Sequence, residues 1–431
     1  MKSLKRANRQ HASTSNSQPS PVTDVCVARQ PIFGTVGDVV GYELLYRRTA
    51  TVTSAGGANR NNATTADPIV HTFLAIGLEQ LTSGRPAYFH FTREMLLGRG
   101  YALMSPESVV VELLQNVEPD EEVETACEEL VDAGYSLALD DFAWSSRYRR
   151  LVELATVVKV DVLDQPAEYL DEIAQRVAPY DVRLLAERVE TEDVHAMCSG
   201  LGYELFQGPF FTRPETTTSR ALMSDEAAVA RTMTIVRDPR TSDADAEAAF
   251  TSDAGLSYKL LRMVNSARGG RGIESIRHAL QLTDRAELSK WLALVLMSSL
   301  AARGPANREL VQLAVQRGRM CELLRTSIES GRDASTLFLV GLFSLLDAIS
   351  GIPMSKLLDS IALATPLRQA LMERTGPYAG PLTLTEAYEQ GAWSQVGERA
   401  SSSGIDAAQV ATYYVQSLGW TRERLLSLAL G

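Results

Sequence analysis

Short apolar runs that alternate with helical segments constrain the N-terminal half of the chain most strongly. Between residues 25 and 211 these runs lie at 39–46, 87–91, 109–113, 136–139, 157–160, 182–186 and 203–206. The segments between them carry apolar residues at helical spacing, as at 119–133. Near-continuous apolar strands separated by helices indicate a mostly parallel sheet. About seven or eight such units predict a compact TIM-like (β/α) barrel.

The pattern changes after Pro214. Strand signals disappear, and helical patterns continue at 225–236, 243–251, 256–265, 276–282, 286–301, 308–330, 336–349, 354–373, 383–388 and 407–428. The turns between them are short, which is typical of a helical bundle. The sequence therefore predicts an α/β barrel followed by an all-α domain. The expected boundaries are a disordered tail at 1–23, the barrel at 24–214, a linker at 215–226 and the helical domain at 227–431.

Charge and hydropathy limit the partners of the chain. The 431 residues carry a formal net charge of −11 without an evident basic patch, so no nucleic-acid partner is expected. The longest apolar stretches, at 291–302 and 337–346, are too short to cross a membrane. The four cysteines form no Cys-x-x-Cys pair, as expected for thiols in a reducing compartment. No apolar segment follows the basic N-terminal residues, so we expect a cytoplasmic protein.

Polar side chains accompany the predicted strands, most of them at the strand ends. Because the carboxyl ends of the strands in such a barrel meet at one mouth, these side chains are expected around one site. So many carboxylates repel one another unless their pKa values shift or divalent cations bind, and Mg²⁺ or Mn²⁺ suits oxygen ligands and phosphodiester hydrolysis. The alternative is that each acid caps a helix or meets solvent. The set comprises Glu43, His90, Glu112, Asp140, Asp141, Lys159, Asp161, Glu187 and Gln207.

Six motifs in order resemble those of the EAL domain family, the cyclic di-GMP phosphodiesterase fold. They are Val-Ala-Arg-Gln-Pro-Ile-Phe at 27–33, Gly-Tyr-Glu-Leu-Leu-Tyr-Arg at 41–47, Ala-Leu-Asp-Asp-Phe at 138–142, Val-Lys-Val-Asp at 158–161, Leu-Ala-Glu-Arg-Val-Glu at 185–190 and Phe-Gln-Gly-Pro-Phe-Phe at 206–211. They are most similar to the branch in which an HDOD domain follows. The segments at 256–267, 273–280 and 288–291 resemble the HDOD core. That domain is related to the HD phosphohydrolases without their His-Asp metal pairs, and none of the five histidines here precedes an Asp.

The resemblance implies a role for each residue of the predicted site. Lys159 falls on the lysine beside the attacking water, and Lys159 and Glu187 would be catalytic if the domain is active. Arg47 corresponds to a phosphate contact and Gln207 to a glutamine that lines the site. The implied metal-ligand positions are Glu43, Glu112, Asp140, Asp141 and Glu187, together with His90, which replaces the family's metal-binding Asn.

Three departures from the family pattern affect the expected activity. His90 suits Mn²⁺ better than Mg²⁺. Gln115 replaces the second Glu of a Glu-x-x-Glu motif, so it lacks the charge that would anchor the neighbouring loop. That loop reads Asp-Asp-Phe-Ala-Trp-Ser-Ser at 140–146, shorter than the family's loop and without its two glycines. These changes predict weak or absent turnover. Trp144 in this loop is expected to stack on a guanine or to close the mouth, with packing into the loop base as the alternative.

The sequence favours a bacterial signalling adaptor with a catalytically inactive EAL domain, which binds a nucleotide such as cyclic di-GMP or only a protein partner, and an HDOD domain, which binds a protein partner. One alternative is an active Mg²⁺- or Mn²⁺-dependent phosphodiesterase that produces pGpG. Another is a structural interaction protein without a ligand. A homodimer is expected from the resemblance alone. The Arg-Gly-Gly-Arg-Gly loop at 268–272 is predicted to contact an acidic surface, with a solvated hinge as the alternative.

Overall fold

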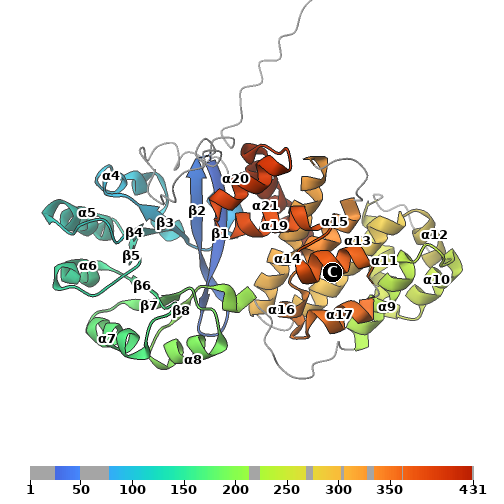
Figure 1. Ribbon diagram of the computed structural model, residues 1–431, viewed down its shortest axis with the longest axis horizontal. Helices are drawn as coiled ribbons and strands as arrows, with labels where there is room; N and C mark the ends of the chain where they lie inside the picture. Colours follow the sequence, from blue (N-terminus) through green and yellow to red (C-terminus); the bar gives the residue numbers. More distant parts are fainter. Residues whose placement is uncertain are drawn as a thin grey trace, which may run out of the picture.

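The computed structural model describes residues 25–48, 77–212, 224–267, 275–301, 305–327, 334–361 and 363–429. The predicted tail at 1–23 and the glycine-rich loop at 268–272 lie outside these residues, as do residues 215–223 of the predicted linker. The described part consists of a barrel and a group of helices beside it (Figure 1). Among these residues, no helix is both long and apolar enough to span a membrane.

Eight strands close into one barrel, in the order in which they occur along the chain. Strands β2 to β8 run parallel, and the predicted barrel with a mostly parallel sheet is confirmed. Strand β1 is antiparallel to β2 and β8, because a short turn at 35–38 joins it to β2 as a hairpin. The strands are β1 (Val25–Gly34), β2 (Val39–Arg48), β3 (Ala87–Phe91), β4 (Val109–Leu113), β5 (Ser136–Leu139), β6 (Val157–Asp161), β7 (Arg183–Glu187) and β8 (Leu205–Phe206).

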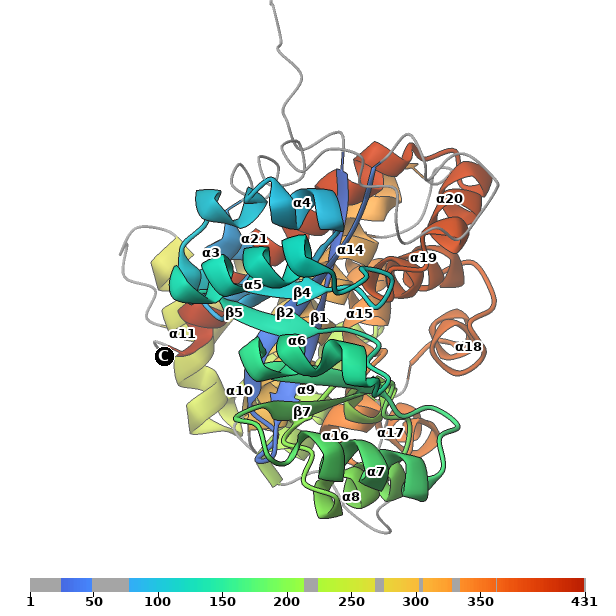
Figure 2. The ribbon, with the colours of Figure 1, turned by 90° about the vertical axis from the view of Figure 1, so that its left-hand side faces the viewer.

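The helices of the barrel pack outside its strands (Figure 2). In α5, for example, the Asp120 side chain caps the first turn by accepting a hydrogen bond from Val123 N at 3.0 Å, and the apolar face is buried. These helices are α3 (Leu78–Thr82), α4 (Arg93–Leu97), α5 (Glu121–Asp132), α6 (Arg149–Leu154), α7 (Ala167–Val177) and α8 (Glu192–Gly200). Short 3₁₀ turns are η2 (Gly100–Leu103), η3 (Pro106–Ser108), η4 (Ser146–Tyr148) and η5 (Pro209–Thr212).

Helices make up the rest of the described chain, as predicted. They are α9 (Ser224–Arg237), α10 (Asp243–Thr251), α11 (Ala254–Ala267), α12 (Ile276–Gln281), α13 (Arg285–Ala301), α14 (Pro305–Leu323), η6 (Leu324–Ser327), α15 (Ala334–Phe343), α16 (Leu346–Ser350), α17 (Met354–Ile361), α18 (Thr365–Glu373), α19 (Ala379–Glu389), α20 (Trp393–Ser402) and α21 (Ala407–Ala429). A single helix was predicted at 336–349 and another at 354–373, but the structure has two helices in each range, α15 and α16 in the first and α17 and α18 in the second. In the second case Pro366 lies at the start of α18, where proline is tolerated.

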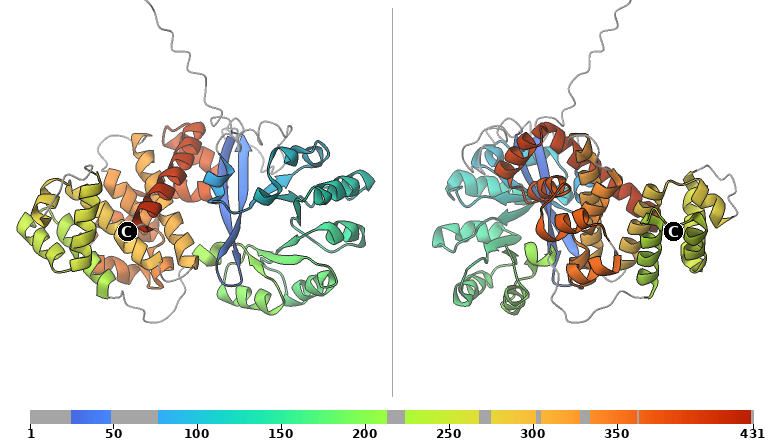
Figure 3. Two further views of the ribbon diagram at one scale, coloured as in Figure 1. Left: turned by 180° about the vertical axis from the view of Figure 1, so that it is seen from behind. Right: turned by 45° about the vertical axis from the view of Figure 1, so that its right-hand side comes forward.

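Two large apolar cores divide the molecule along a line that the predicted boundaries do not follow. One core is formed mainly by helices α9 to α18, with Leu292 and Phe338 among its residues, and it includes Leu382 of α19. The other fills the space around the barrel and includes buried residues of α19, α20 and α21, among them Tyr388 and Tyr414. Figure 3 shows α21 beside the long strands β1 and β2 in both views. The domain boundaries therefore stay a prediction.

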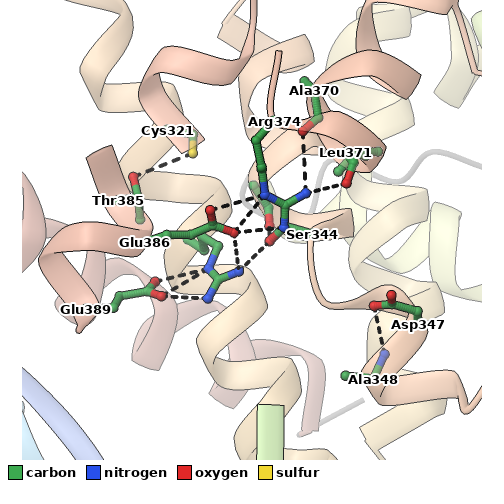
Figure 4. A network of polar contacts seen from close by, with 12 residues as sticks. Cys321, Ser344, Asp347, Ala348, Ala370, Leu371, Arg374, Thr385, Glu386 and Glu389 are labelled. Atoms are coloured by element: carbon green, nitrogen blue, oxygen red, sulfur yellow. Dashed lines mark hydrogen bonds and ion pairs between the residues drawn. The ribbon is translucent and has the colours of Figure 1, made fainter. Parts of the chain in front are cut away.

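A network of charged side chains, of which those of Arg317 and Glu389 are buried, ties α14 to α18 and α19 (Figure 4). The guanidinium of Arg317 donates to Glu389 Oε2 at 2.7 Å and to Ser344 Oγ at 2.9 Å. Glu386 accepts hydrogen bonds from both Arg317 and Arg374. Two arginines thus face two glutamates, so the charges in this network balance.

Candidate functional site

Lys159 lies at the centre of the acidic residues that the sequence predicted. Its side chain on β6 is completely buried. Its Nζ lies 2.8 Å from Glu112 Oε1, 2.9 Å from Glu187 Oε1, 3.0 Å from Asp140 Oδ1 and 3.2 Å from Glu43 Oε2. These acids come from β2, from β4, from the end of β5 and from β7. The convergence expected at the mouth of the barrel is therefore present for these four acids.

His90 on β3 faces three of the same carboxylates. Its Nε2 lies 3.1 Å from Glu43 Oε1, 3.3 Å from Glu112 Oε2 and 3.5 Å from Asp140 Oδ2. The Tyr46 hydroxyl donates to the backbone carbonyl of His90 at 2.9 Å, which fixes β3 against β2. The imidazole thus lies among the acids, as expected for a residue at a metal-ligand position.

The negative charge of this cluster shifts the pKa values of its members. Burial raises the pKa of Glu112 to about 7 and that of Glu187 to about 8, although Lys159 acts in the opposite direction. Burial opposes the charging of His90, but the surrounding carboxylates outweigh it and raise its pKa to about 9. Lys159 and His90 also outweigh burial at Glu43 and hold its pKa below the ordinary range. Without a bound metal cation, the protons that these side chains hold at their raised pKa values offset the excess negative charge of the carboxylates.

Gln207 connects the cluster to β1. Its Nε2 donates to Glu43 Oε2 at 2.8 Å and to Gln30 Oε1 at 2.9 Å. Gly208 follows with φ of 150°, and a Cβ there would lie 2.4 Å from the backbone of Val189, so only glycine fits. The sequence predicted Gln207 but missed Gln30. The only signal for Gln30 was its place in the 27–33 motif, because β1 runs opposite to the other strands.

The remaining predicted residues lie around this cluster. Asp141 follows β5 with φ of 48°, in the left-handed region that few side chains adopt. Arg47 lies further along β2 than Glu43, toward the end of the strand at the mouth. The side chain of Asp161 forms an ion pair with Arg188 and accepts a hydrogen bond from Leu163 N, so those contacts direct it away from Lys159.

The loop after β5 is anchored in a way that the sequence did not predict. The Tyr148 hydroxyl donates to the backbone carbonyl of Gln115 at 3.2 Å, so the anchor needs no charge on the side chain at 115. The ring of Trp144 packs edge-on against Phe142 with 6.3 Å between ring centroids. Trp144 thus packs into the loop base, which was the second of the two expectations.

The donor set fits a divalent cation. Glu43, His90 and Glu112 each offer a ligand atom, and these atoms lie within 4.8 Å of one another. Glu112 is completely buried, and within the described residues neither of its oxygens accepts a hydrogen bond of good geometry, although Lys159 Nζ lies close. Buried carboxylate oxygens without hydrogen-bond donors are costly unless a cation compensates them. One imidazole and several carboxylates suit Mn²⁺ in particular.

Comparison with known proteins agrees with this architecture. The EAL domain family matches residues 62–214, and the HDOD domain family matches residues 222–359. The cyclic di-GMP phosphodiesterase CdgJ of Vibrio cholerae is 31% identical over 404 residues, which cover 92% of each chain. The chain belongs to the EAL–HDOD family. The uncharacterized protein YuxH of Bacillus subtilis is 28% identical over 404 residues, or 92% of this chain and 98% of YuxH.

Among solved structures, the Bacillus subtilis YkuI protein, with an EAL domain and in complex with substrate c-di-GMP and calcium, is also similar. It is 16% identical, and the match covers 62% of this chain and 73% of YkuI with a TM-score of 0.36. The EAL match begins after β2, so β1, β2 and Glu43 lie outside it, although both strands belong to the closed barrel. The HDOD match ends within α17, so helices α18 to α21 lie beyond it.

Proposed function

We propose that the EAL barrel of this chain binds a divalent cation and cleaves cyclic di-GMP to pGpG. The observation that carries the proposal is the group of four carboxylates around Lys159, three of them buried and that of Glu187 partly buried, in which acids outnumber Lys159 and His90. A buried site with excess negative charge attracts a cation. The printed name of the Vibrio cholerae relative, a cyclic di-GMP phosphodiesterase, supports the same chemistry.

Each side chain has a role that follows from its surroundings. A cation held by Glu43, His90 and Glu112 would polarise a phosphoryl oxygen and acidify a bound water. Lys159 stays protonated, because the acids around it raise its pKa well above the ordinary value, so it neutralises charge rather than accepting a proton. Gln207 orients Glu43 by donating to its Oε2. Arg47 is proposed to contact a phosphate of the nucleotide, and Asp140, Asp141 and Glu187 are proposed as further ligands.

Multiple-turnover assays of cyclic di-GMP cleavage test this function. Production of pGpG with Mn²⁺ is expected, with a lower rate in Mg²⁺, because the imidazole of His90 is a better ligand for Mn²⁺. Glu43→Ala should abolish it. Glu204→Gln is the matched control, because this exposed acid at the start of β8 pairs with Arg183 away from the cluster. The absence of pGpG with either cation would overturn the proposal.

The second candidate is a signalling adaptor whose barrel binds cyclic di-GMP without cleaving it. The position of His90 favours it, because a protonated imidazole within 3.5 Å of three carboxylates supplies part of the charge that a cation would supply. In both candidates we propose that the HDOD domain binds a protein partner in the cytoplasm and that the chain forms a homodimer. Calorimetry with cyclic di-GMP, together with the pGpG assay, separates the two candidates.

A further inference from the structure

One edge of β1 is completed by tyrosines from the C-terminal helices. Among the described strands, β1 pairs with β2 along its length but with β8 only at Phe33 and Gly34. On the edge that β8 leaves open, Val27 N donates to the Tyr388 hydroxyl at 3.1 Å and Arg29 N donates to the Tyr414 hydroxyl at 3.2 Å. Residues two apart on a strand present their N–H groups to the same edge. The two hydroxyls therefore accept the hydrogen bonds that a neighbouring strand would otherwise accept.

The contact between these helices and the hairpin is buried and closely packed. Tyr388 of α19 and Tyr414 of α21 are almost fully buried, with 4.7 Å between their ring centroids. The turn after α19 approaches β2 at Gly391, which has φ of 65°. A Cβ there would lie 2.7 Å from Leu45 Cδ1. Most buried residues of α19 to α21 belong to the barrel's apolar core, although Ala379 and Leu382 of α19 belong to the core of α9 to α18. Tyr388 and Tyr414 thus belong to the barrel's core, while α19 and α21 also pack against α14 of the helical domain.

The same edge leads directly to the cluster around Lys159. Arg29, whose N–H binds Tyr414, is followed by Gln30, which faces Glu43 across the β1–β2 ladder. Gln207 then donates to both Gln30 and Glu43. A shift of β1 therefore moves Gln30, which accepts a hydrogen bond from the same Gln207 amide that orients Glu43, a proposed ligand.

The outer face of β2 is fixed from the helical side as well. The hydroxyl of Tyr42, next to Glu43, donates to Glu309 Oε2 of α14 at 2.7 Å. The buried guanidinium of Arg29 lies 4.5 Å from the centre of the Tyr42 ring. The strand that carries Glu43 is thus held on its outer side by contacts from beyond the barrel's own helices.

We propose that α19 to α21 form a structural part of the EAL barrel, and that Tyr388 and Tyr414 are positioning residues that hold Gln30 and Glu43 in place for cation binding. The second half of this proposal rests on the proposed function. The HDOD helices α9 to α17 are then inserted between β8 and the elements that complete the barrel.

Conservative variants of the full-length chain test the proposal. Tyr388→Phe, Tyr414→Phe and the double variant remove the hydroxyls while keeping the rings. Tyr135→Phe is the matched control, because it removes another buried hydroxyl of the barrel, which donates to the Met104 carbonyl at 2.8 Å away from β1. Amide hydrogen exchange is followed in peptides covering β1, Mn²⁺ affinity by calorimetry, and stability by urea unfolding.

In the tyrosine variants, exchange in β1 should become about tenfold faster, because an amide that loses its buried partner opens more readily. Mn²⁺ should bind about tenfold more weakly, as when an indirect ligand support is removed. Tyr135→Phe should lose similar stability and change neither quantity. Unchanged exchange in β1 would overturn the structural part, and faster exchange with unchanged Mn²⁺ affinity would overturn the positioning role. If the wild type binds no Mn²⁺, the proposed function and the positioning role both fail, while exchange still decides whether the helices hold β1.

Discussion

The charged side chains around Arg317 and those around Lys159 form two groups that differ in their balance of charge. Around Arg317, two arginines face two glutamates, and their charged groups have hydrogen-bond partners. Around Lys159, four carboxylates face one lysine and one histidine, and both oxygens of Glu112 lack a good hydrogen-bond donor within the described residues. A balanced network is complete in itself and specifies packing. An unbalanced one remains costly until a ligand binds, and such groups are concentrated at functional sites.

Removing the central cation of each group should have the largest effect. Lys159→Met and Arg317→Met each leave buried carboxylates without their main counter-charge, and each should cost about 3–5 kcal/mol in the free energy of unfolding. Saturating Mn²⁺ should restore a large part of the stability of Lys159→Met, because it can replace the lost positive charge. It should leave Arg317→Met unchanged. Urea unfolding with and without Mn²⁺ measures both, and equal rescue of the two variants would remove the distinction between the groups.

The pH dependence of stability should differ with and without cation. The folded-state pKa values of Glu112 (about 7), Glu187 (about 8) and His90 (about 9) lie above the ordinary values of 4.5, 4.5 and 6.5. A group with a raised folded-state pKa contributes stability below its ordinary pKa and loses it as the pH rises through the raised value. The cation-free protein should therefore lose about 2 kcal/mol or more between pH 5 and pH 9.

Saturating Mn²⁺ should flatten this decline, because the cation replaces the protons that the acids hold. Urea unfolding at a series of pH values, with Mn²⁺ and with a chelator, gives the two curves. Parallel curves in the two conditions would contradict the assignment of the raised pKa values to the cation site.

The loop after β5 offers a smaller and more local comparison. Tyr148→Phe removes the hydroxyl that donates to the Gln115 carbonyl and should cost about 1 kcal/mol. Because this contact anchors the loop beside the cluster, pGpG production should fall as well. Tyr135→Phe, which removes a buried hydroxyl that donates to the Met104 carbonyl, should cost a similar amount without slowing turnover. Equal turnover in both variants would mean that the loop anchor has no part in catalysis.

The barrel was predictable because its signals are local. The apolar runs that became β3 and β4 match the observed strands, and strand-end acids such as Glu112 and Glu187 converge as the geometry of a parallel barrel requires. Gln30 could not be derived in this way, because its place depends on the antiparallel pairing of β1 with β2. The roles of Tyr388 and Tyr414 depend on contacts with residues more than 350 positions away in the sequence. No local pattern of apolar and polar residues records such contacts.

The prediction of weak turnover depends on His90, on Gln115 and on the short loop after β5. The backbone contact from Tyr148 supplies an anchor that Gln115 cannot supply through charge. His90 is then the main departure that bears on cation binding, and it lies within the proposed ligand set rather than outside it.

The most direct test of whether the cluster around Lys159 binds a cation is a calorimetric titration with Mn²⁺. It uses the purified full-length chain at pH 8. Saturable binding is expected in the wild type and in Glu204→Gln, with a loss of about 10- to 100-fold or more in affinity for both Glu43→Ala and Glu112→Gln. Wild-type protein that binds no Mn²⁺, or that binds it equally well after both substitutions, would contradict the assignment of this cluster as a cation site.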